Sequence, residues 1–118
     1  MARLSTHVLD TMQGKPAADV ALELWRLGKD NSRALVTRAR TNADGRTDAP
    51  LMTGDRMEVG QYELVFQIGD YFRASGVALP EPAFLDIVPL RFGIADAAGH
   101  YHVPLLASPF AYSTYRGS

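Results

Sequence analysis

Two histidines separated by one residue stand near the end of the chain, and they are the side chains best suited to chemistry. A strand here would place His100 and His102 on one face, opposite Val103 and Leu105. A neutral imidazole accepts a proton near pH 7 and also binds metal ions. His-X-His spacing suits a metal site, but without cysteine the other ligands would have to be His7 or carboxylates. Because this spacing alone is a weak signal, we expect no metal, and each histidine could equally be a half-exposed strand residue.

Two arginines could hold a planar anion, because a guanidinium donates two parallel hydrogen bonds. Arg46 follows the turn-prone Thr41-Asn-Ala-Asp-Gly45, and Arg116 stands two residues before the final Ser118. Each could also be an ordinary solvated side chain beside a turn or a chain end. The aromatic and β-branched residues around Arg116 favour an end that packs rather than frays. From these residues alone we predict a small-molecule site and no particular reaction.

The composition excludes several classes of protein. The chain has 118 residues, of which 47% are hydrophobic and 21% charged, and this is typical of a single globular domain over 1–118. A formal net charge of -1 without a basic stripe argues against a nucleic acid or an anionic membrane as the partner. The absence of cysteine excludes disulfides and thiolate chemistry. The first residues lack the apolar core of a signal peptide, and no apolar run approaches membrane-spanning length, so we expect a cytoplasmic protein.

Short strands must position the candidate residues. Apolar residues alternate at period two in 20–26 and 62–68. Less regular alternation predicts further strands at 4–9, 34–41, 84–94, 101–107 and 110–116. Only 69–76 is predicted to be a short helix, with Asp70 as its N-cap and Gly76 as its stop. Seven or eight strands and one helical turn predict an all-β sandwich. We interpret a few polar residues near the start as strand-end and turn residues rather than a triad, namely Ser5, Thr6, Asp10 and Thr11.

Three stretches of the chain carry a family resemblance. The first is Leu4-Ser-Thr-His-Val-Leu-Asp10 with Gly14-Lys-Pro-Ala17, and the second is Thr41-Asn-Ala-Asp-Gly-Arg46. The third is His100-Tyr-His-Val-Pro-Leu-Leu106 with the ending Tyr112-Ser-Thr-Tyr-Arg-Gly-Ser118. Together they resemble the transthyretin-like 5-hydroxyisourate hydrolases over the whole chain. The terminal Tyr-Arg-Gly-Ser is the part that separates these hydrolases from hormone-binding transthyretin.

The resemblance implies a transthyretin-like sandwich of two four-stranded sheets with one short helix. It implies a homotetramer, a dimer of dimers, with active sites in grooves where the dimers meet. The implied reaction opens the lactam ring of 5-hydroxyisourate by hydrolysis, without a cofactor, and gives 2-oxo-4-hydroxy-4-carboxy-5-ureidoimidazoline in urate catabolism. The implied catalytic residues are His7, Arg46 and His102. The implied substrate-binding residues form the tail, namely Tyr115, Arg116, Gly117 and Ser118.

The chemistry of these residue types is compatible with that reaction. Either His7 or His102 could deprotonate the attacking water, and the residues do not decide between them. Arg46 would bind the substrate and stabilise the charge that develops on oxygen and nitrogen. Tyr115 would act as a plug that makes the groove shallow, and Ser118 would contribute its hydroxyl or its carboxylate. The alternative is a transthyretin-type binding module for a small hydrophobic ligand, which would not need both histidines, the arginine and this tail together.

Overall fold

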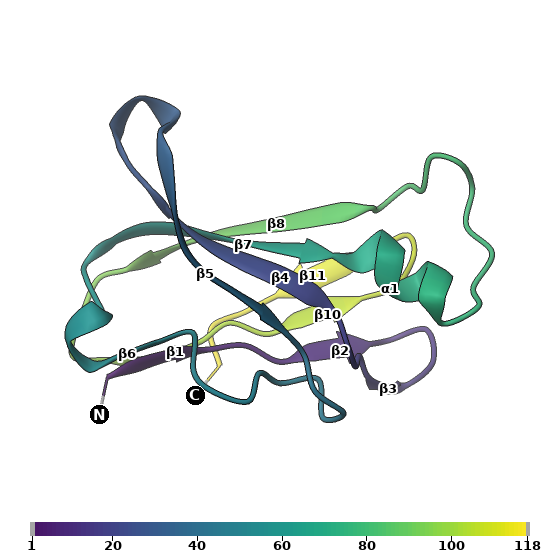
Figure 1. Ribbon diagram of the computed structural model, residues 1–118, viewed down its shortest axis with the longest axis horizontal. Coiled ribbons are helices and arrows are strands. Elements are labelled where there is room, and N and C mark those ends of the chain that lie inside the picture. Colours follow the sequence, from purple (N-terminus) through teal and green to yellow (C-terminus); the bar gives the residue numbers. More distant parts are fainter. Residues whose placement is uncertain (1, 118) are drawn as a thin grey trace.

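The computed structural model describes residues 2–117 and consists mainly of two packed β-sheets. The first sheet is antiparallel and has the strand order β5-β4-β7-β8 (Figure 1). Its strands are β4 (Ala21–Leu27), β5 (Arg33–Arg40), β7 (Gly60–Gln67) and β8 (Ile87–Ile94). Two single 3-10 turns lie in the connections, η1 (Lys29–Asn31) after β4 and η2 (Gly54–Arg56) before β7.

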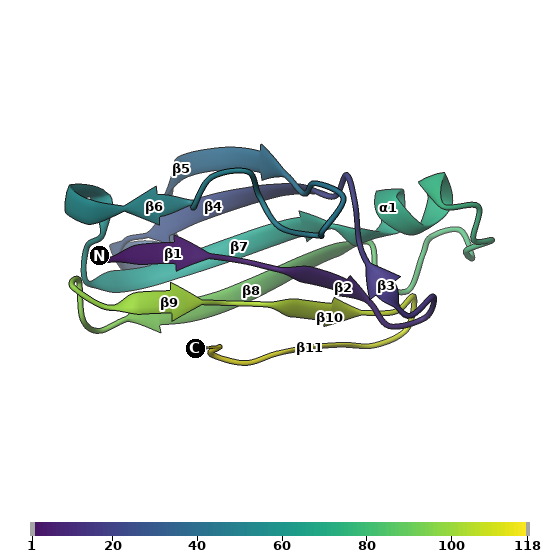
Figure 2. The ribbon, with the colours of Figure 1, turned by 90° about the horizontal axis from the view of Figure 1, so that it is seen from below.

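The second sheet is built from short strands that lie end to end. They are β1 (Arg3–Ser5), β2 (Val8–Asp10), β3 (Lys15–Pro16), β6 (Met52–Thr53), β9 (His100–His102), β10 (Leu105–Ala107) and β11 (Tyr112–Thr114). One part has the order β6-β1-β9 and the other β11-β10-β2-β3. Between them, Val103 N–H donates to Ser5 O at 2.9 Å and Leu105 N–H donates to His7 O at 2.9 Å. These bonds join the parts into one layer four strands wide, which Figure 2 shows in front of the first sheet. The predicted sandwich is confirmed.

The core between the sheets follows the predicted alternation. Leu22 and Leu24 of β4 are buried, and so are Tyr62, Leu64 and Phe66 of β7. Fully burying a side chain of this size stabilises the folded chain by about 1.5–3 kcal/mol. The alternating residues of β4 and β7 therefore determine which face of the first sheet packs against the core. On the second sheet Leu4, Val8 and Leu105 fill the same core. Their neighbours in sequence therefore face outward, and this outer face carries the candidate residues.

The helix α1 (Ile68–Ala74) begins directly after β7, one residue earlier than predicted. Asp70 is not its N-cap, so that prediction is wrong; Asp70 lies in the first turn and pairs with Arg73 at 3.1 Å. The predicted stop at Gly76 is confirmed. Gly76 has φ +86°, and the bonds from Val77 N to Phe72 O and from Gly76 N to Arg73 O close a Schellman motif. No helix among the described residues is long and apolar enough to cross a membrane.

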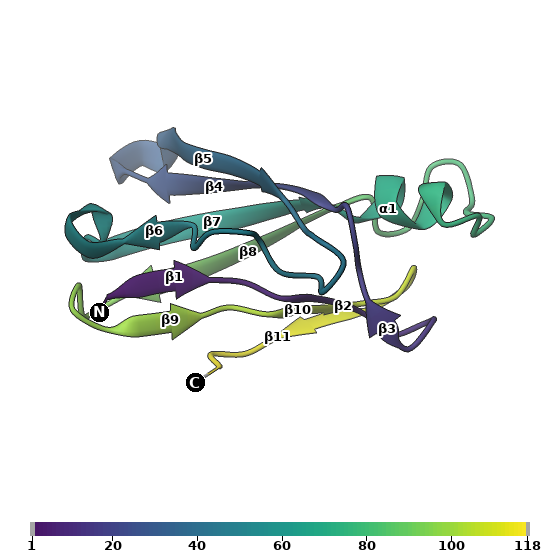
Figure 3. The same cartoon turned by 60° about the horizontal axis from the view of Figure 1, so that its bottom comes forward.

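Strand boundaries differ from the prediction where local chemistry interrupts pairing. The segment 84–94 forms a strand only from Ile87, after the stretch that contains Pro80 and Pro82. The segment 101–107 is divided at residues 103–104, where Pro104 has no N–H to donate. The final strand pairs over Tyr112–Thr114, and the residues beyond it continue along the sheet (Figure 3).

Candidate functional site

His7 and Arg46 meet on the outer face of the second sheet. The turn before Arg46 is built by Asn42, whose Oδ1 accepts from the backbone N–H groups of Asp44 at 2.9 Å and Arg46 at 3.2 Å. Gly45 has φ +76°, and a Cβ there would overlap the Val8 carbonyl oxygen. Only glycine fits at this position of the turn. The turn brings Arg46 beside His7, and the two residues form an isolated antiparallel β-bridge.

The side chain of His7 is held by the same turn. Its Nε2 lies 2.7 Å from the carbonyl oxygen of Asp44. A carbonyl oxygen only accepts hydrogen bonds, so Nε2 must carry a proton. In the neutral ring Nδ1 is then the only nitrogen of His7 that can accept a proton.

His102 lies on the same face, one strand away. The parallel pairing of β1 with β9 sets Ser5 beside His102, and Ser5 Oγ lies 2.8 Å from His102 Nδ1. Burial lowers the pKa of the His102 imidazole below its ordinary value of 6.5, and its coulombic interactions with Arg46, His7 and Arg3 lower it further. His102 is therefore held neutral at pH 7, the state that a general base needs.

The tail after β11 is fastened to the sheet. Thr114 Oγ1 donates to Pro104 O at 2.7 Å, and Gly117 N–H donates to His102 O at 2.7 Å. The guanidinium of Arg116 lies 4.0 Å from the centre of the Tyr101 ring, and its Nη2 donates to His100 O at 3.0 Å. The end is therefore held to the sheet up to Gly117 and not frayed, although the side chains of residues 112–116 stay exposed.

The structure brings His7, Arg46, His102 and Gly117 together. The guanidinium of Arg116 contacts the Tyr101 ring and the His100 carbonyl oxygen and not the imidazoles. These contacts hold the tail against the sheet. Tyr115 is 59% exposed. Ser118 lies outside the described residues. His100 is exposed and offers only its carbonyl oxygen to Arg116.

Sequence reasoning missed two residues of this face. Ser5 ends β1 as predicted, but its hydroxyl also contacts His102, and Arg3 contributes to the positive potential at that imidazole. The period-two order Arg3, Ser5, His7 already placed them on the face of the first histidine. Thr6, Asp10 and Thr11 instead bond the backbone or support the second sheet and α1, so they form no triad.

Metal binding has little support in this geometry. Among residues 2–117, no three histidine or carboxylate side chains gather as ligands for an ion. His102 Nδ1 is occupied by Ser5, and His7 Nε2 by a carbonyl oxygen. What the arrangement offers is a neutral imidazole, an N–H donor and a guanidinium on one open face, which suits proton transfer beside a developing negative charge.

Comparison with known proteins gives one consistent result. Residues 4–117 match the HIUase/Transthyretin family. A protein of Rhizobium meliloti (strain 1021) named 5-hydroxyisourate hydrolase 2 is 62% identical over 116 residues, covering 98% of this chain and 96% of that one. The crystal structure of (S)-allantoin synthase superposes with a TM-score of 0.93 at 46% identity, covering 99% of this chain and 44% of that one. Sea bream transthyretin, solved in complex with thyroxine, superposes with a TM-score of 0.85 at 28% identity over 98% of this chain and 94% of its own.

Proposed function

We propose that this chain, which belongs to the HIUase/Transthyretin family, hydrolyses 5-hydroxyisourate to 2-oxo-4-hydroxy-4-carboxy-5-ureidoimidazoline in urate catabolism. The observation that carries the proposal is the place of His102, whose pKa is lowered, beside Arg46 and His7 on one face of a sheet. The relative from Rhizobium meliloti, named for this activity and 62% identical, supports the choice of substrate. We propose that no cofactor takes part, since His102 can supply the base and Arg46 the charge stabilisation that the hydrolysis needs.

In the proposed reaction His102 is the general base. It takes a proton from water as the water oxygen attacks the lactam carbonyl carbon, and the carbonyl oxygen becomes negative. Arg46 stabilises that oxygen by charge and hydrogen bonding. The ring C–N bond then breaks, and the protonated His102 returns its proton to the leaving nitrogen. The lowered pKa of His102 supports this assignment, and so does the occupation of His7 Nε2 by a carbonyl. His7 would orient the turn that presents Arg46.

The tail is proposed to close one side of the site. Gly117 is bonded to the backbone of His102, and Tyr115 stands two residues before it at an exposed position. Ser118 follows directly and stays a predicted substrate contact, as does Arg116. A purely binding role, as sea bream transthyretin has for thyroxine in its complex, would not call for a neutral base beside a guanidinium.

We further propose that the chain forms a homotetramer, assembled as a dimer of dimers. The cytoplasmic location stays a prediction. The strands β8 and β11 end their sheets at the same edge of the molecule (Figure 2), and their free backbone groups can pair with a second copy. Phe84 and Phe110 are 69% and 61% exposed, with ring centres 5.9 Å apart. Such a pair suits a subunit contact. The open site face would become a groove once a neighbouring copy covers it.

The activity is tested by following the ultraviolet absorbance of freshly generated 5-hydroxyisourate, with the spontaneous decay subtracted. The wild-type chain should accelerate the decay, and a decay equal to that of buffer would overturn the proposed function.

The assembly is tested by light scattering with Phe110→Asp, which should give smaller species. Val59→Asp is the matched control, since Val59 is 57% exposed and precedes Gly60, at the opposite end of the β7–β8 pair from Ile87, the strand residue nearest Phe84 in sequence. An active wild-type monomer would contradict the tetramer.

A further inference from the structure

We propose that Ser5 is a positioning residue for the reaction: its hydroxyl accepts a hydrogen bond from His102 Nδ1–H and so aims the Nε2 lone pair into the open site. This inference rests on the proposed hydrolase function. It adds to that function a residue that touches His102 and not the substrate, and it explains how one imidazole nitrogen is selected as the base.

The backbone makes the Ser5–His102 contact obligatory. β1 and β9 are parallel neighbours, and their register sets Ser5 directly beside His102. Both side chains face outward, because Leu4 and Tyr101 on the opposite faces are buried in the core. The Oγ–Nδ1 distance of 2.8 Å is that of a good hydrogen bond. Within residues 2–117, His102 is the sole hydrogen-bond partner of the Ser5 hydroxyl.

The opposite edge of the imidazole is confined by the tail. A Cβ built on Gly117 would lie 2.6 Å from His102 Cδ2, the ring carbon bonded to Nε2. The Gly117 backbone therefore packs directly against the ring, and it is tied to the same residue by the bond to His102 O. Turning the ring over would exchange Nδ1 for a C–H group opposite Ser5 and lose the hydrogen bond. Ser5 on one side and Gly117 on the other thus leave one orientation, with Nε2 facing outward.

The hydroxyl suits both protonation states that a base must pass through. In the neutral ring with its proton on Nδ1, Ser5 Oγ accepts a hydrogen bond from Nδ1–H and Nε2 keeps a lone pair. After Nε2 has taken a proton from water, Nδ1–H still donates to the same oxygen, so nothing has to rotate. The backbone carbonyl at His7 works differently, because it fixes a proton on Nε2 of that ring. With this assignment the two histidines take opposite tautomers and are suited to different tasks.

Three variants isolate the role of the hydroxyl. Ser5→Ala removes the oxygen with almost no change in volume, and Ser5→Thr retains a hydroxyl on a residue that strands tolerate well. His100→Ala, on the same strand, is the matched control because His100 uses only its carbonyl. The measured quantities are kcat, KM, the pH profile and the tautomer of His102, read from long-range 15N–1H spectra of the imidazole. Thermal unfolding checks that each variant is folded.

We expect the wild-type spectrum at neutral pH to show the proton of His102 on Nδ1. Ser5→Ala should lower kcat about 10- to 100-fold, less than removal of the base itself, with KM nearly unchanged. Loss of a hydrogen bond to the charged ring should lower the pKa of His102 further and shift the acid limb to lower pH. Ser5→Thr should restore both the tautomer and most of kcat.

A neutral wild-type His102 protonated on Nε2 would overturn the positioning role, as would a folded Ser5→Ala protein with wild-type tautomer and kcat. These results are separable from failure of the proposed function. If the wild-type chain does not hydrolyse 5-hydroxyisourate, the function fails, and the tautomer in wild type and Ser5→Ala still decides whether Ser5 orients the ring.

Discussion

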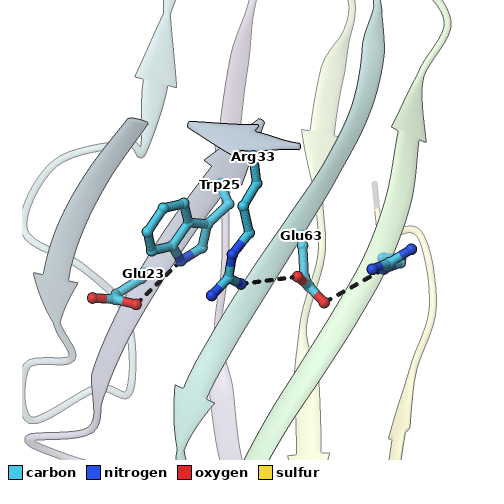
Figure 4. Close-up of polar contacts among 5 residues, drawn as sticks. Glu23, Trp25, Arg33 and Glu63 are labelled. Atoms are coloured by element: carbon cyan, nitrogen blue, oxygen red, sulfur yellow. Dashed lines mark hydrogen bonds and ion pairs between the residues drawn. The ribbon is translucent and has the colours of Figure 1, made fainter. Parts of the chain in front are cut away.

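The outer faces of the two sheets use the same kinds of side chain in opposite ways. On the first sheet, acids and bases alternate across neighbouring strands (Figure 4). Arg38 Nε lies 2.9 Å from Glu23, and Glu63 lies between Arg33 at 3.4 Å and Arg91 at 3.5 Å. Trp25 Nε1 donates to Glu23 at 3.1 Å, and the Arg33 guanidinium lies 4.2 Å from the centre of the Trp25 ring. Each of these charged side chains has an ion-pair partner, and Glu63 is shared by two arginines.

The outer face of the second sheet lacks that balance. Arg3, Arg46, His7 and His102 share it, and within residues 2–117 no carboxylate forms an ion pair with either arginine. The partner of His102 is a hydroxyl, and that of His7 is a carbonyl oxygen. An excess of positive charge disfavours the folded chain slightly but attracts an anionic or acceptor-rich ligand. The two faces therefore differ in whether their arginines form ion pairs and not in how many charged side chains they carry. Arginines without a carboxylate partner distinguish the candidate site from an ordinary surface.

The largest effect should come from removing the base. His102→Ala should lower kcat about 10²–10⁴-fold, because it removes the imidazole proposed to take the proton from water. His100→Ala, two residues away on the same strand, should retain wild-type kcat. Both are measured by the absorbance decay of 5-hydroxyisourate, with circular dichroism to check folding. Equal rates for the two variants would remove the distinction between the site and its exposed neighbour.

The next effect compares an unpaired arginine with a paired one. Arg46→Ala should lower kcat about 10²–10³-fold, as loss of one oxyanion-stabilising donor typically does. Arg38→Ala, on the balanced face, should leave kcat unchanged and reduce the free energy of unfolding by only about 0–1 kcal/mol. Steady-state kinetics and urea unfolding of both variants give the comparison. A kinetic loss in Arg38→Ala of the size seen in Arg46→Ala would show that the balanced face is functional too.

Part of this contrast could be predicted from the sequence. Period two placed His100 and His102 on one face, and the turn chemistry around Gly45 marked the place of Arg46. The family resemblance supplied the pairing of His7 with Arg46. The Ser5–His102 contact joins residues 97 positions apart through a parallel strand pair, and no local pattern specifies which strands pair. Glu63 is on the outward side of its strand yet only 7% exposed, since arginines from two other strands cover it.

A smaller effect concerns pH. Because the pKa of His102 lies below its ordinary value, the rate should persist below pH 6.5 and fall only when the ring becomes protonated. Arg3→Gln removes one of the positive charges that hold this pKa down. The pKa should then rise, so the acid limb of kcat should move to higher pH. Lys15→Gln removes a charge of the same sign from the other end of the sheet and serves as the control. An acid limb that moves equally in both variants, or in neither, would contradict this account.

The smallest effect on activity should come from the balanced face itself. Glu63→Ala leaves Arg33 and Arg91 without their shared partner, but their side chains are 48% and 63% exposed and can be hydrated. The free energy of unfolding should therefore fall by only about 1 kcal/mol, measured from the urea midpoint, while kcat and KM stay at their wild-type values. Glu58→Ala is the control, because within residues 2–117 this exposed carboxylate pairs with Arg26 alone, at 3.4 Å, and its loss should cost less. A Glu63→Ala protein with lower kcat and unchanged stability would contradict this account. A buried carboxylate on the first sheet would then influence chemistry on the second, and ion pairing would not distinguish a structural face from a catalytic one.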